Sequence, residues 1–232
     1  RDRLDVYSEA MKKNVQVVVV SPDNNRAPKP VVYLLHGYGG NAKTWISMNP
    51  ELKDIADRDG LIFVCPDGKN SWYWDSPKDP SYRYETFVSS ELIKYIDSEY
   101  PTVKDRSGRA ITGLSMGGHG AMWLSFRHKD VFGAAGSTSG GVDIRPFPNN
   151  WEMSKQLGSE SANHEVWNRH TAITQIDRIK NGELAIIFDC GYSDFFFEVN
   201  NDFHKKLLKY KIDHDFLVRP GSHNGCLLYT SD

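Results

Sequence analysis

Cysteine, long apolar runs and net charge are all scarce in this chain of 232 residues, and each scarcity excludes a class of protein. Its three cysteines, Cys65, Cys190 and Cys226, are too few for a disulfide framework and lack metal-ligand spacing. The longest apolar run, VQVVVV at 15–20, is far shorter than a membrane span. A net charge of −2 offers no electrostatic basis for binding nucleic acid or an anionic membrane.

A secretory signal peptide is also missing, and the first residue is Arg1 rather than Met. We therefore expect a mature or trimmed form, whose original compartment the sequence leaves open. Cys65 and Cys190 each end an apolar run, as small buried residues do. A disulfide between them is the minor alternative, because sequence alone determines pairing weakly.

Short apolar runs alternate with amphipathic stretches along the chain, without repeats or low-complexity linkers. Such runs are typical of strands buried on both faces, so the pattern predicts an α/β fold. We expect about eight mostly parallel strands, opened by an antiparallel pair and covered by helices on both faces. Strands are predicted at 4–8, 15–22, 31–37, 61–68, 109–115, 132–140, 184–191 and 213–221, and helices at 50–60, 84–100, 116–128 and 195–210.

A single domain is expected over residues 1–232, because α/β folds of this length commonly form one domain. Residues 140–182 form an irregular stretch that is long for a connection. We predict that this stretch is a cap or a pocket wall.

One serine stands between two glycines in GLSMGGHG, where the strand at 109–115 meets the helix at 116–128. A strand that turns sharply into a helix strains the turn residue and leaves no room for neighbouring side chains, so the flanking residues must be glycine. Such a turn would expose the hydroxyl of Ser115 and aim the N–H of Met116 at nearby negative charge. Because glycine is common, a glycine-rich turn with an incidental serine is the competing interpretation.

Ligands of parallel sheets bind at the carboxyl ends of the strands, so the residues after each strand decide between these interpretations. Ser115, Asp194 and His223 follow three different strands at this edge. Their chain order, Ser…Asp…His, is that of α/β-hydrolases. We therefore predict an α/β-hydrolase fold in which Ser115 is the nucleophile, His223 the general base and Asp194 the acid that orients the imidazole.

Other residues compete for the roles of base and acid. His214 lies at the opposite end of its strand, and His204 lies mid-helix beside lysines. His119 precedes the acid in the chain, although it is placed to line the site. Asp189 is the rival acid, but it comes too early to reach over the edge of the sheet.

The HGYGG motif directly after the strand at 31–37 is predicted to complete the catalytic site. Its glycines let the backbone approach a ligand closely. We expect the N–H groups of Tyr38 and Met116 to form an oxyanion hole. An ordinary glycine turn is the alternative.

Five aromatic residues lie in the loop at 70–84, without helical or strand spacing. We interpret Trp72 and Trp74 as candidates for a binding wall for an aryl or sugar group, with simple loop packing as an equal alternative. Trp151 and Trp167 in the irregular stretch are placed to face them across a cleft.

These motifs resemble those of the esterase D-like family of α/β-hydrolases. They are also similar to bacterial feruloyl and acetylxylan esterases, S-formylglutathione hydrolases and the mycolyltransferases of the antigen 85 group. The resemblance runs from about residue 5 to residue 223. The motifs that carry it are YLLHGYGG, VCPDG, SWYWDSP, ITGLSMGGHGA and FGAAGSTSGGVDIRPFP.

The resemblance implies a serine acyl hydrolase without metal or cofactor. It places the nucleophile on Ser115, the acid on Asp194, the base on His223 and the oxyanion donors on Tyr38 and Met116. It also implies a small-molecule or oligosaccharide ester as substrate, namely a feruloyl or acetyl ester of plant cell-wall carbohydrate, and a secreted or periplasmic location.

Two alternatives stay open. One is a cytoplasmic small-acyl thioesterase such as an S-formylglutathione hydrolase, and the other is a non-catalytic carbohydrate-binding protein on the same scaffold. The oligomeric state is not indicated. Family members usually continue past the histidine with a His-x-Trp-x-x-Trp segment and a final helix. Here only nine residues follow His223, so the last helix is expected to be missing or replaced.

Overall fold

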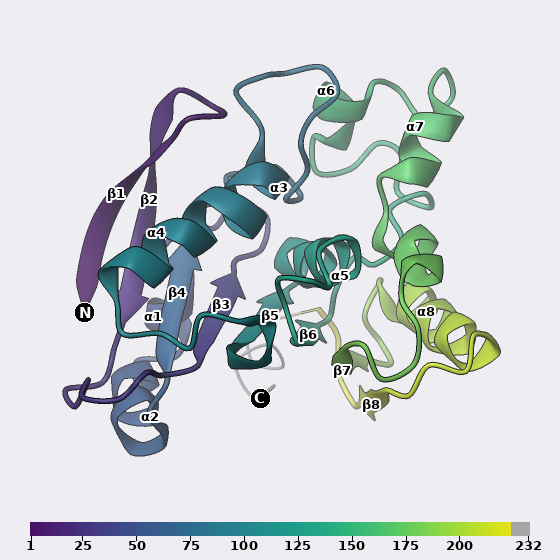
Figure 1. Ribbon diagram of the computed structural model, residues 1–232. Coiled ribbons are helices and arrows are strands. Elements are labelled where there is room, and N and C mark those ends of the chain that lie inside the picture. Colours follow the sequence, from purple (N-terminus) through teal and green to yellow (C-terminus); the bar gives the residue numbers. More distant parts are fainter. Residues whose placement is uncertain (224–232) are drawn as a thin grey trace.

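A computed structural model describes residues 1–223 of the chain (Figure 1). One eight-stranded sheet runs through it in the order β1-β2-β4-β3-β5-β6-β7-β8. The pairs β1–β2 and β2–β4 are antiparallel and all others are parallel, which confirms the predicted sheet and its opening pair. The strands are β1 Asp2–Ser8, β2 Lys13–Val20, β3 Val31–Leu35, β4 Ile62–Pro66, β5 Arg109–Leu114, β6 Ala134–Thr138, β7 Ala185–Gly191 and β8 Asp215–Arg219.

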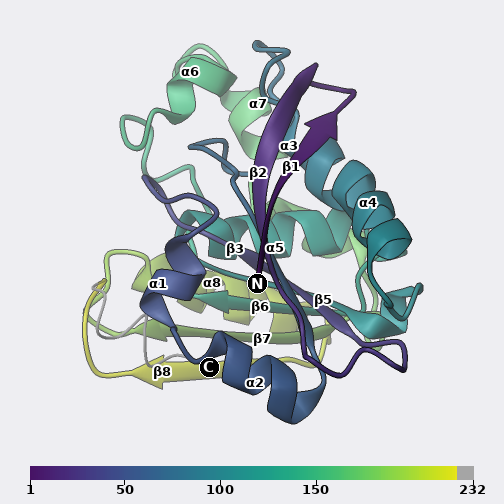
Figure 2. The same ribbon diagram turned by 90° about the vertical axis from the view of Figure 1, so that its left-hand side faces the viewer.

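Helices pack on both faces of the sheet (Figure 2). A small core joins α1 and α2 to one face of β2, β3 and β4, and a much larger core joins α4, α5 and α8 to the opposite face. Within residues 1–223, no helix is long and apolar enough to cross a membrane. The helices are α1 Thr44–Met48, α2 Leu52–Asp59, α3 Tyr84–Thr86, α4 Leu92–Glu99, α5 Met116–Arg127, α6 Met153–Leu157, α7 His164–Arg169 and α8 Phe197–Lys209.

Two predicted segments differ in detail from the structure. The helix expected at 84–100 is divided into α3, a π-helical turn at Phe87–Glu91, and α4. The stretch at 140–182 contains the short helices α6 and α7 and a 3₁₀ helix at Ala172–Arg178. Whether that stretch acts as a cap or pocket wall stays a prediction.

Half of one sheet face has no helix on it within residues 1–223. On the side of α1 and α2, the strands β5 to β8 form an apolar hollow of about 790 Å³. Ile187 and Leu217 point to this side and are exposed. The predicted absence of a last helix concerns residues 224–232, which lie outside the described residues.

The cysteines at 65 and 190 are buried, as expected, and do not form a disulfide. Cys65 and Cys190 are buried free thiols. Burial raises the pKa of each thiol to about 12, so neither is a thiolate at neutral pH. Cys226 lies outside the described residues.

A buried carboxylate fastens the C-terminal end of α5 to α3. Glu85 Oε2 accepts hydrogen bonds from Arg127 Nε at 2.8 Å and from His128 Nε2 at 2.7 Å. Burial by itself raises the pKa of Glu85, but the bonds from His128 and Arg127 outweigh it and lower the pKa below the ordinary 4.5. Folding therefore favours the ionised carboxylate.

Replacing Glu85 with glutamine should lower the free energy of unfolding at pH 7 by about 1–3 kcal/mol, the range for hydrogen bonds to charged groups. A depressed pKa contributes stability above the unfolded value and loses it as pH falls through the folded value. The difference between Glu85→Gln and wild type should therefore shrink between pH 5 and pH 3. Urea unfolding across this range checks the expectation, and a difference independent of pH would contradict it.

Candidate active site

Ser115 occupies a strained turn between β5 and α5. Its backbone has φ 56° and ψ −115°, a region that L-residues avoid at a cost of about 1–3 kcal/mol. Two hydrogen bonds hold the turn: Ser115 N donates to the carbonyl of Thr138 at 3.0 Å, and Gly141 N donates to the carbonyl of Ser115 at 3.1 Å. The sharp turn is the one predicted from the glycine spacing.

The flanking glycines are required by contact distances. A Cβ at Gly113 would lie 2.1 Å from the carbonyl oxygen of Gly117, and a Cβ at Gly117 would lie 2.2 Å from that of Leu35. Both clashes are with backbone, which cannot move aside as a flexible side chain can. Glycine is therefore required at positions 113 and 117 because α5 lies very close to the ends of β5 and β3.

The structure brings together the three residues predicted to carry the chemistry. His223 Nε2 lies 3.0 Å from Ser115 Oγ, and His223 Nδ1 lies 2.8 Å from Asp194 Oδ2. Asp194 is buried, and its Oδ1 accepts a hydrogen bond from the N–H of Phe196 at 2.7 Å. This geometry suits transfer of the serine proton to the imidazole.

The competing acid and bases lie elsewhere. Asp189 Oδ2 is 3.6 Å from the guanidinium of Arg219 on the neighbouring strand β8. His204 and His214 are hydrogen-bonded to each other at 2.7 Å, Nδ1 to Nε2. His119 is fully buried.

Two phenylalanines directly after the acid hold the imidazole of His223 in place. The ring centroid of Phe195 lies 4.4 Å from that of His223, and Phe196 meets it edge-on at 5.5 Å. Phe196 is buried, whereas Phe195 is 52% exposed. Both residues were predicted only as the start of the helix at 195–210. The signal that could have revealed them is the run of three phenylalanines beside Asp194.

The HGYGG loop lies directly against the nucleophile. A Cβ at Gly37 would be 3.4 Å from the Cβ of Ser115, so the following Tyr38 starts beside the serine. Met116 is the first residue of α5, where N–H groups have no carbonyl within the helix to bind. The positions suit the predicted oxyanion donors, whose role stays a prediction.

Side chains both within and outside the HGYGG motif hold this loop. Gly39 N donates to Asn70 Oδ1 at 2.8 Å, and Tyr38 Oη donates to Glu152 Oε2 at 2.9 Å. His36 Nε2 accepts from Gly68 N at 2.8 Å, so His36 Nδ1 is the nitrogen that donates to the carbonyl of Gly37, at 2.7 Å. Asn70 and Glu152 were not predicted as site residues, because neither stands in a recognisable motif for this role. His36 belongs to the HGYGG motif, but its side chain was given no role of its own.

The prediction that Trp72, Trp74 and His119 line the substrate site is corrected by their burial. Trp72 is 1% exposed, and Trp74 and His119 are 0% exposed. Trp72 and Tyr73 adopt positive φ values of 55° and 63°, which turn successive aromatic side chains into the core and abolish any regular spacing. Burial lowers the pKa of His119 to about 3, so it is neutral at pH 7. Trp167 is also fully buried.

Trp151 is the predicted tryptophan that reaches the rim of the site. It is partly exposed, stacks on Phe195 with centroids 5.8 Å apart, and packs from behind on Trp72, also at 5.8 Å. Tyr38 is 42% exposed, and its hydroxyl donates to Glu152, the residue that follows Trp151. The aromatic surface beside Ser115 is therefore formed by Trp151, Phe195 and Tyr38.

Comparison with known proteins identifies the family and the fold. Residues 8–223 match the model of the family described as "Putative esterase". The chain belongs to this esterase family. It is 24% identical to an acetyl esterase of Caldicellulosiruptor saccharolyticus, over 96% of this chain and 91% of that protein. A diacylglycerol acyltransferase/mycolyltransferase of Mycobacterium leprae is 32% identical over 81% of this chain and 62% of its own length.

Solved structures show the same fold. A ferulic acid esterase is 28% identical with a TM-score of 0.79, covering 99% of this chain and 92% of that one. A substrate-bound fluorophosphonate-binding serine hydrolase of Staphylococcus aureus has a TM-score of 0.84 at 21% identity, covering 98% and 93% of the two chains. The predicted α/β-hydrolase fold and the esterase family are thereby confirmed, and the protein is a carboxylic ester hydrolase that acts on small-molecule esters.

The choice of acid can be tested by two matched substitutions. Asp194→Asn should lower kcat by about 10³- to 10⁴-fold, because His223 loses the partner that orients its imidazole. Asp189→Asn should mainly lower stability, because it weakens a contact between β7 and β8. Steady-state kinetics and thermal unfolding of both variants separate these effects, and the reverse pattern would refute the choice of Asp194.

The loop contact of Asn70 should affect the rate more than substrate binding. Asn70→Ala removes the acceptor that holds Gly39 and should lower kcat by about tenfold, since complete loss of an oxyanion donor costs about 10²- to 10³-fold. KM should change little. Asn70→Asp keeps an oxygen acceptor and should restore most of the rate, whereas equal losses in both variants would argue against positioning through this bond.

Proposed function

We propose that this esterase cleaves feruloyl esters of plant cell-wall carbohydrate through a Ser115–His223–Asp194 triad and an acyl-enzyme intermediate. The observation that carries the mechanism is the continuous hydrogen-bonded path from Ser115 Oγ through His223 to Asp194. The exposed aromatic surface next to that path supports an aromatic acyl group over acetyl.

In the first half of the reaction, His223 Nε2 takes the proton of Ser115 while Oγ attacks the ester carbonyl carbon. The carbonyl oxygen becomes an oxyanion, which the N–H groups of Tyr38 and Met116 stabilise. Asp194 stabilises the imidazolium without taking its proton. The imidazolium then protonates the departing sugar alcohol, and the acyl group remains on Ser115.

In the second half, His223 removes a proton from water, which attacks the acyl-enzyme carbonyl. The oxyanion re-forms at the same donors and collapses, releasing ferulate as Ser115 recovers its proton. A secreted or periplasmic location fits this substrate, because plant polysaccharide does not enter the cytoplasm. No metal or cofactor takes part in the proposed reaction.

The Ser115→Ala variant tests the nucleophile. Its kcat on methyl ferulate should fall by about 10⁴- to 10⁶-fold while thermal unfolding stays close to wild type. Initial rates on methyl ferulate, p-nitrophenyl acetate and S-formylglutathione measure both the loss and the preference. Substantial turnover by folded Ser115→Ala would refute the mechanism, and the highest kcat/KM on S-formylglutathione would refute the substrate in favour of the thioesterase alternative.

Trp151→Ala tests the aromatic surface. Because aromatic contacts contribute about 0.5–1.5 kcal/mol, KM for methyl ferulate should rise about 3- to 10-fold, while kcat/KM for p-nitrophenyl acetate should hardly change. Tyr7→Ala, which removes an exposed aromatic ring from β1, is the matched control and should change neither value. Equal losses of kcat/KM on both esters would indicate a structural role for Trp151 instead.

A further inference from the structure

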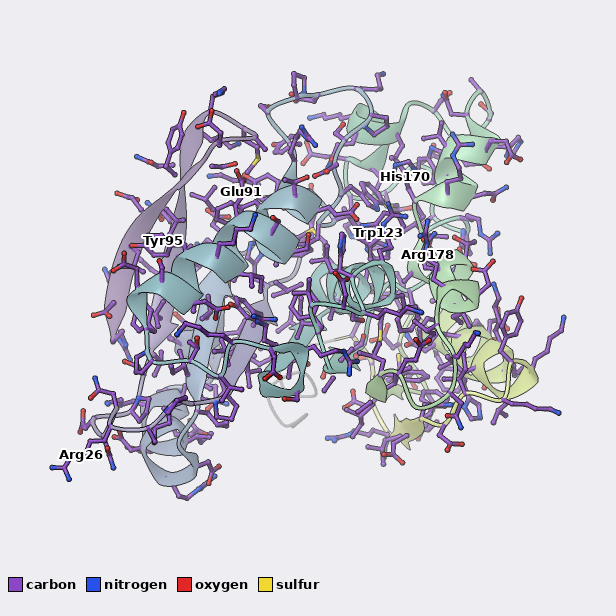
Figure 3. All side chains as sticks on the ribbon, viewed as in Figure 1. Arg26, Glu91, Tyr95, Trp123, His170 and Arg178 are labelled. Atoms are coloured by element: carbon purple, nitrogen blue, oxygen red, sulfur yellow. The ribbon has the colours of Figure 1, made fainter. Side chains whose placement is uncertain are left out.

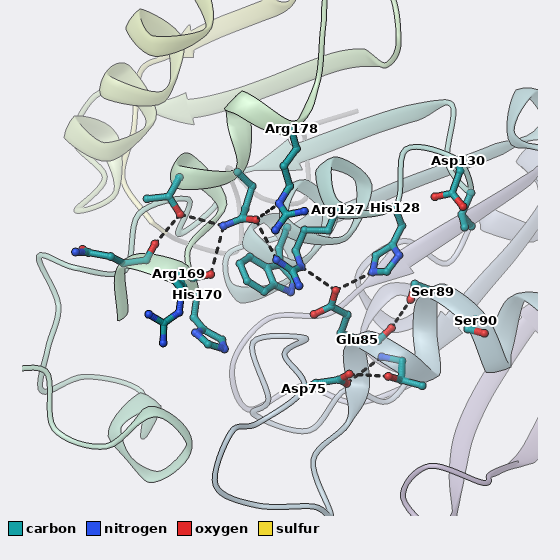
Figure 4. Close-up of a pocket in the computed structure, with 16 residues that line it drawn as sticks. Asp75, Glu85, Ser89, Ser90, Arg127, His128, Asp130, Arg169, His170 and Arg178 are labelled. Atoms are coloured by element: carbon teal, nitrogen blue, oxygen red, sulfur yellow. Dashed lines mark hydrogen bonds and ion pairs between the residues drawn. The ribbon is translucent and has the colours of Figure 1, made fainter. Parts of the chain in front are cut away.

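A second cavity, of about 760 Å³, opens at the opposite end of α5 from Ser115 (Figure 4). It is lined by residues from three segments, at 75–90, 123–131 and 168–178, and by none of the proposed triad. Figure 3 shows Trp123, His170 and Arg178 together on this side of the molecule. The proposed esterase reaction makes no use of this cavity.

Two guanidinium groups converge on one neutral oxygen in the cavity. Gln175 Oε1 accepts hydrogen bonds from Arg127 Nη1 at 3.1 Å and from Arg178 Nε at 2.7 Å. Gln175 is buried, and its Nε2 donates to the carbonyl of Arg169 and to Thr174 Oγ1, which determines the orientation of the amide. Like charges held this close repel, and a bound anion would relieve the repulsion.

Two carboxylates that line the cavity, Glu85 and Asp75, already accept hydrogen bonds. Glu85 Oε2 binds both Arg127 and His128, as described above. Asp75 Oδ1 accepts from the N–H of Thr86 at 3.0 Å, and its Oδ2 accepts from the hydroxyl of the same residue at 2.6 Å. Neither acid forms a hydrogen bond or ion pair with Arg169 or Arg178 within residues 1–223.

Several arginine donors remain without acceptors. Within residues 1–223, the side chain of Arg178 donates a hydrogen bond only through Nε. In the same part of the chain, the guanidinium of Arg169 makes no hydrogen bond or ion pair. Arg127 likewise leaves Nη2 unused in that part of the chain. Asp130, the third carboxylate of the lining, lies away from Arg178 in Figure 4.

We propose that this cavity binds a sugar acid, whose carboxylate is held by Arg178 and Arg127. Guanidinium groups are planar forks that match carboxylates with two parallel hydrogen bonds. The volume lies within the range of about 300–1,000 Å³ typical of small-molecule sites. The neighbouring hydroxyl and amide groups suit sugar hydroxyls, and they belong to Thr86, Ser90, Asn168 and Thr174.

Calorimetric titration of the full chain with D-glucuronate tests the proposal, with D-glucose, acetate and inorganic phosphate at equal ionic strength for comparison. Glucuronate should bind more tightly than each of the other three. Arg178→Gln, a change of an exposed side chain, should weaken glucuronate binding by tenfold or more. Arg26→Gln is the matched control, because Arg26 lies at the far end of the molecule in Figure 3, and it should bind as wild type does.

The catalytic site provides an independent reference. Arg178→Gln should hydrolyse p-nitrophenyl acetate at the wild-type rate, and Ser115→Ala should still bind glucuronate. The proposal is wrong if glucose, acetate or phosphate binds as tightly as glucuronate, if Arg178→Gln binds glucuronate as tightly as wild type, or if Ser115→Ala abolishes binding. None of these outcomes depends on whether feruloyl esters are the substrate.

Discussion

The strained turn at Ser115 is the constraint on which the site depends. Holding a serine at φ 56° requires a strand that ends, a helix that begins at once, and no side chain on either flank. The strand is β5, which lies in the middle of the sheet and ends at Leu114. The helix is α5, which begins at Met116 and has most of its side chains buried. The packing of α5 against the sheet offsets the strain.

The remaining site residues are positioned by the same edge of the sheet. β3 ends at the HGYGG loop, β7 ends before Asp194, and β8 ends before His223. Each residue therefore comes from a different loop, and neither Asp194 nor His223 could be moved alone without breaking the hydrogen-bonded path. The imidazole of His223 is additionally confined by Phe195 and Phe196, so side-chain packing, and not only hydrogen bonding, determines where it lies.

Much of this arrangement was predictable because its signals are local. The apolar runs of the strands and the glycines around Ser115 each reflect contacts within a few residues, and the strand order brings their ends to one edge. The position of Asp194 beside His223 was also predictable, since Asp194 lies past the end of β7 whereas Asp189 lies within that strand.

The lining of the substrate site was less predictable because it depends on packing between distant segments. Trp72 enters the core where Gly141 leaves space, with ring atoms 2.8 Å from the position of a Cβ there. Tyr73 fills the corresponding space at Gly68 and Gly120. The residue spacing in the loop at 70–84 does not reveal the space available at these glycines. The rim of the site is formed instead by Trp151 and Phe195.

The most direct test of the account is to capture the acyl group on the serine. Rapid mixing with p-nitrophenyl ferulate, followed by acid quenching and mass spectrometry of the peptides, identifies any esterified residue. The account predicts a burst of p-nitrophenol and one feruloyl group on the peptide containing Ser115, absent in Ser115→Ala. Catalytic turnover with the acyl group on another residue, or an undiminished burst in Ser115→Ala, would contradict it.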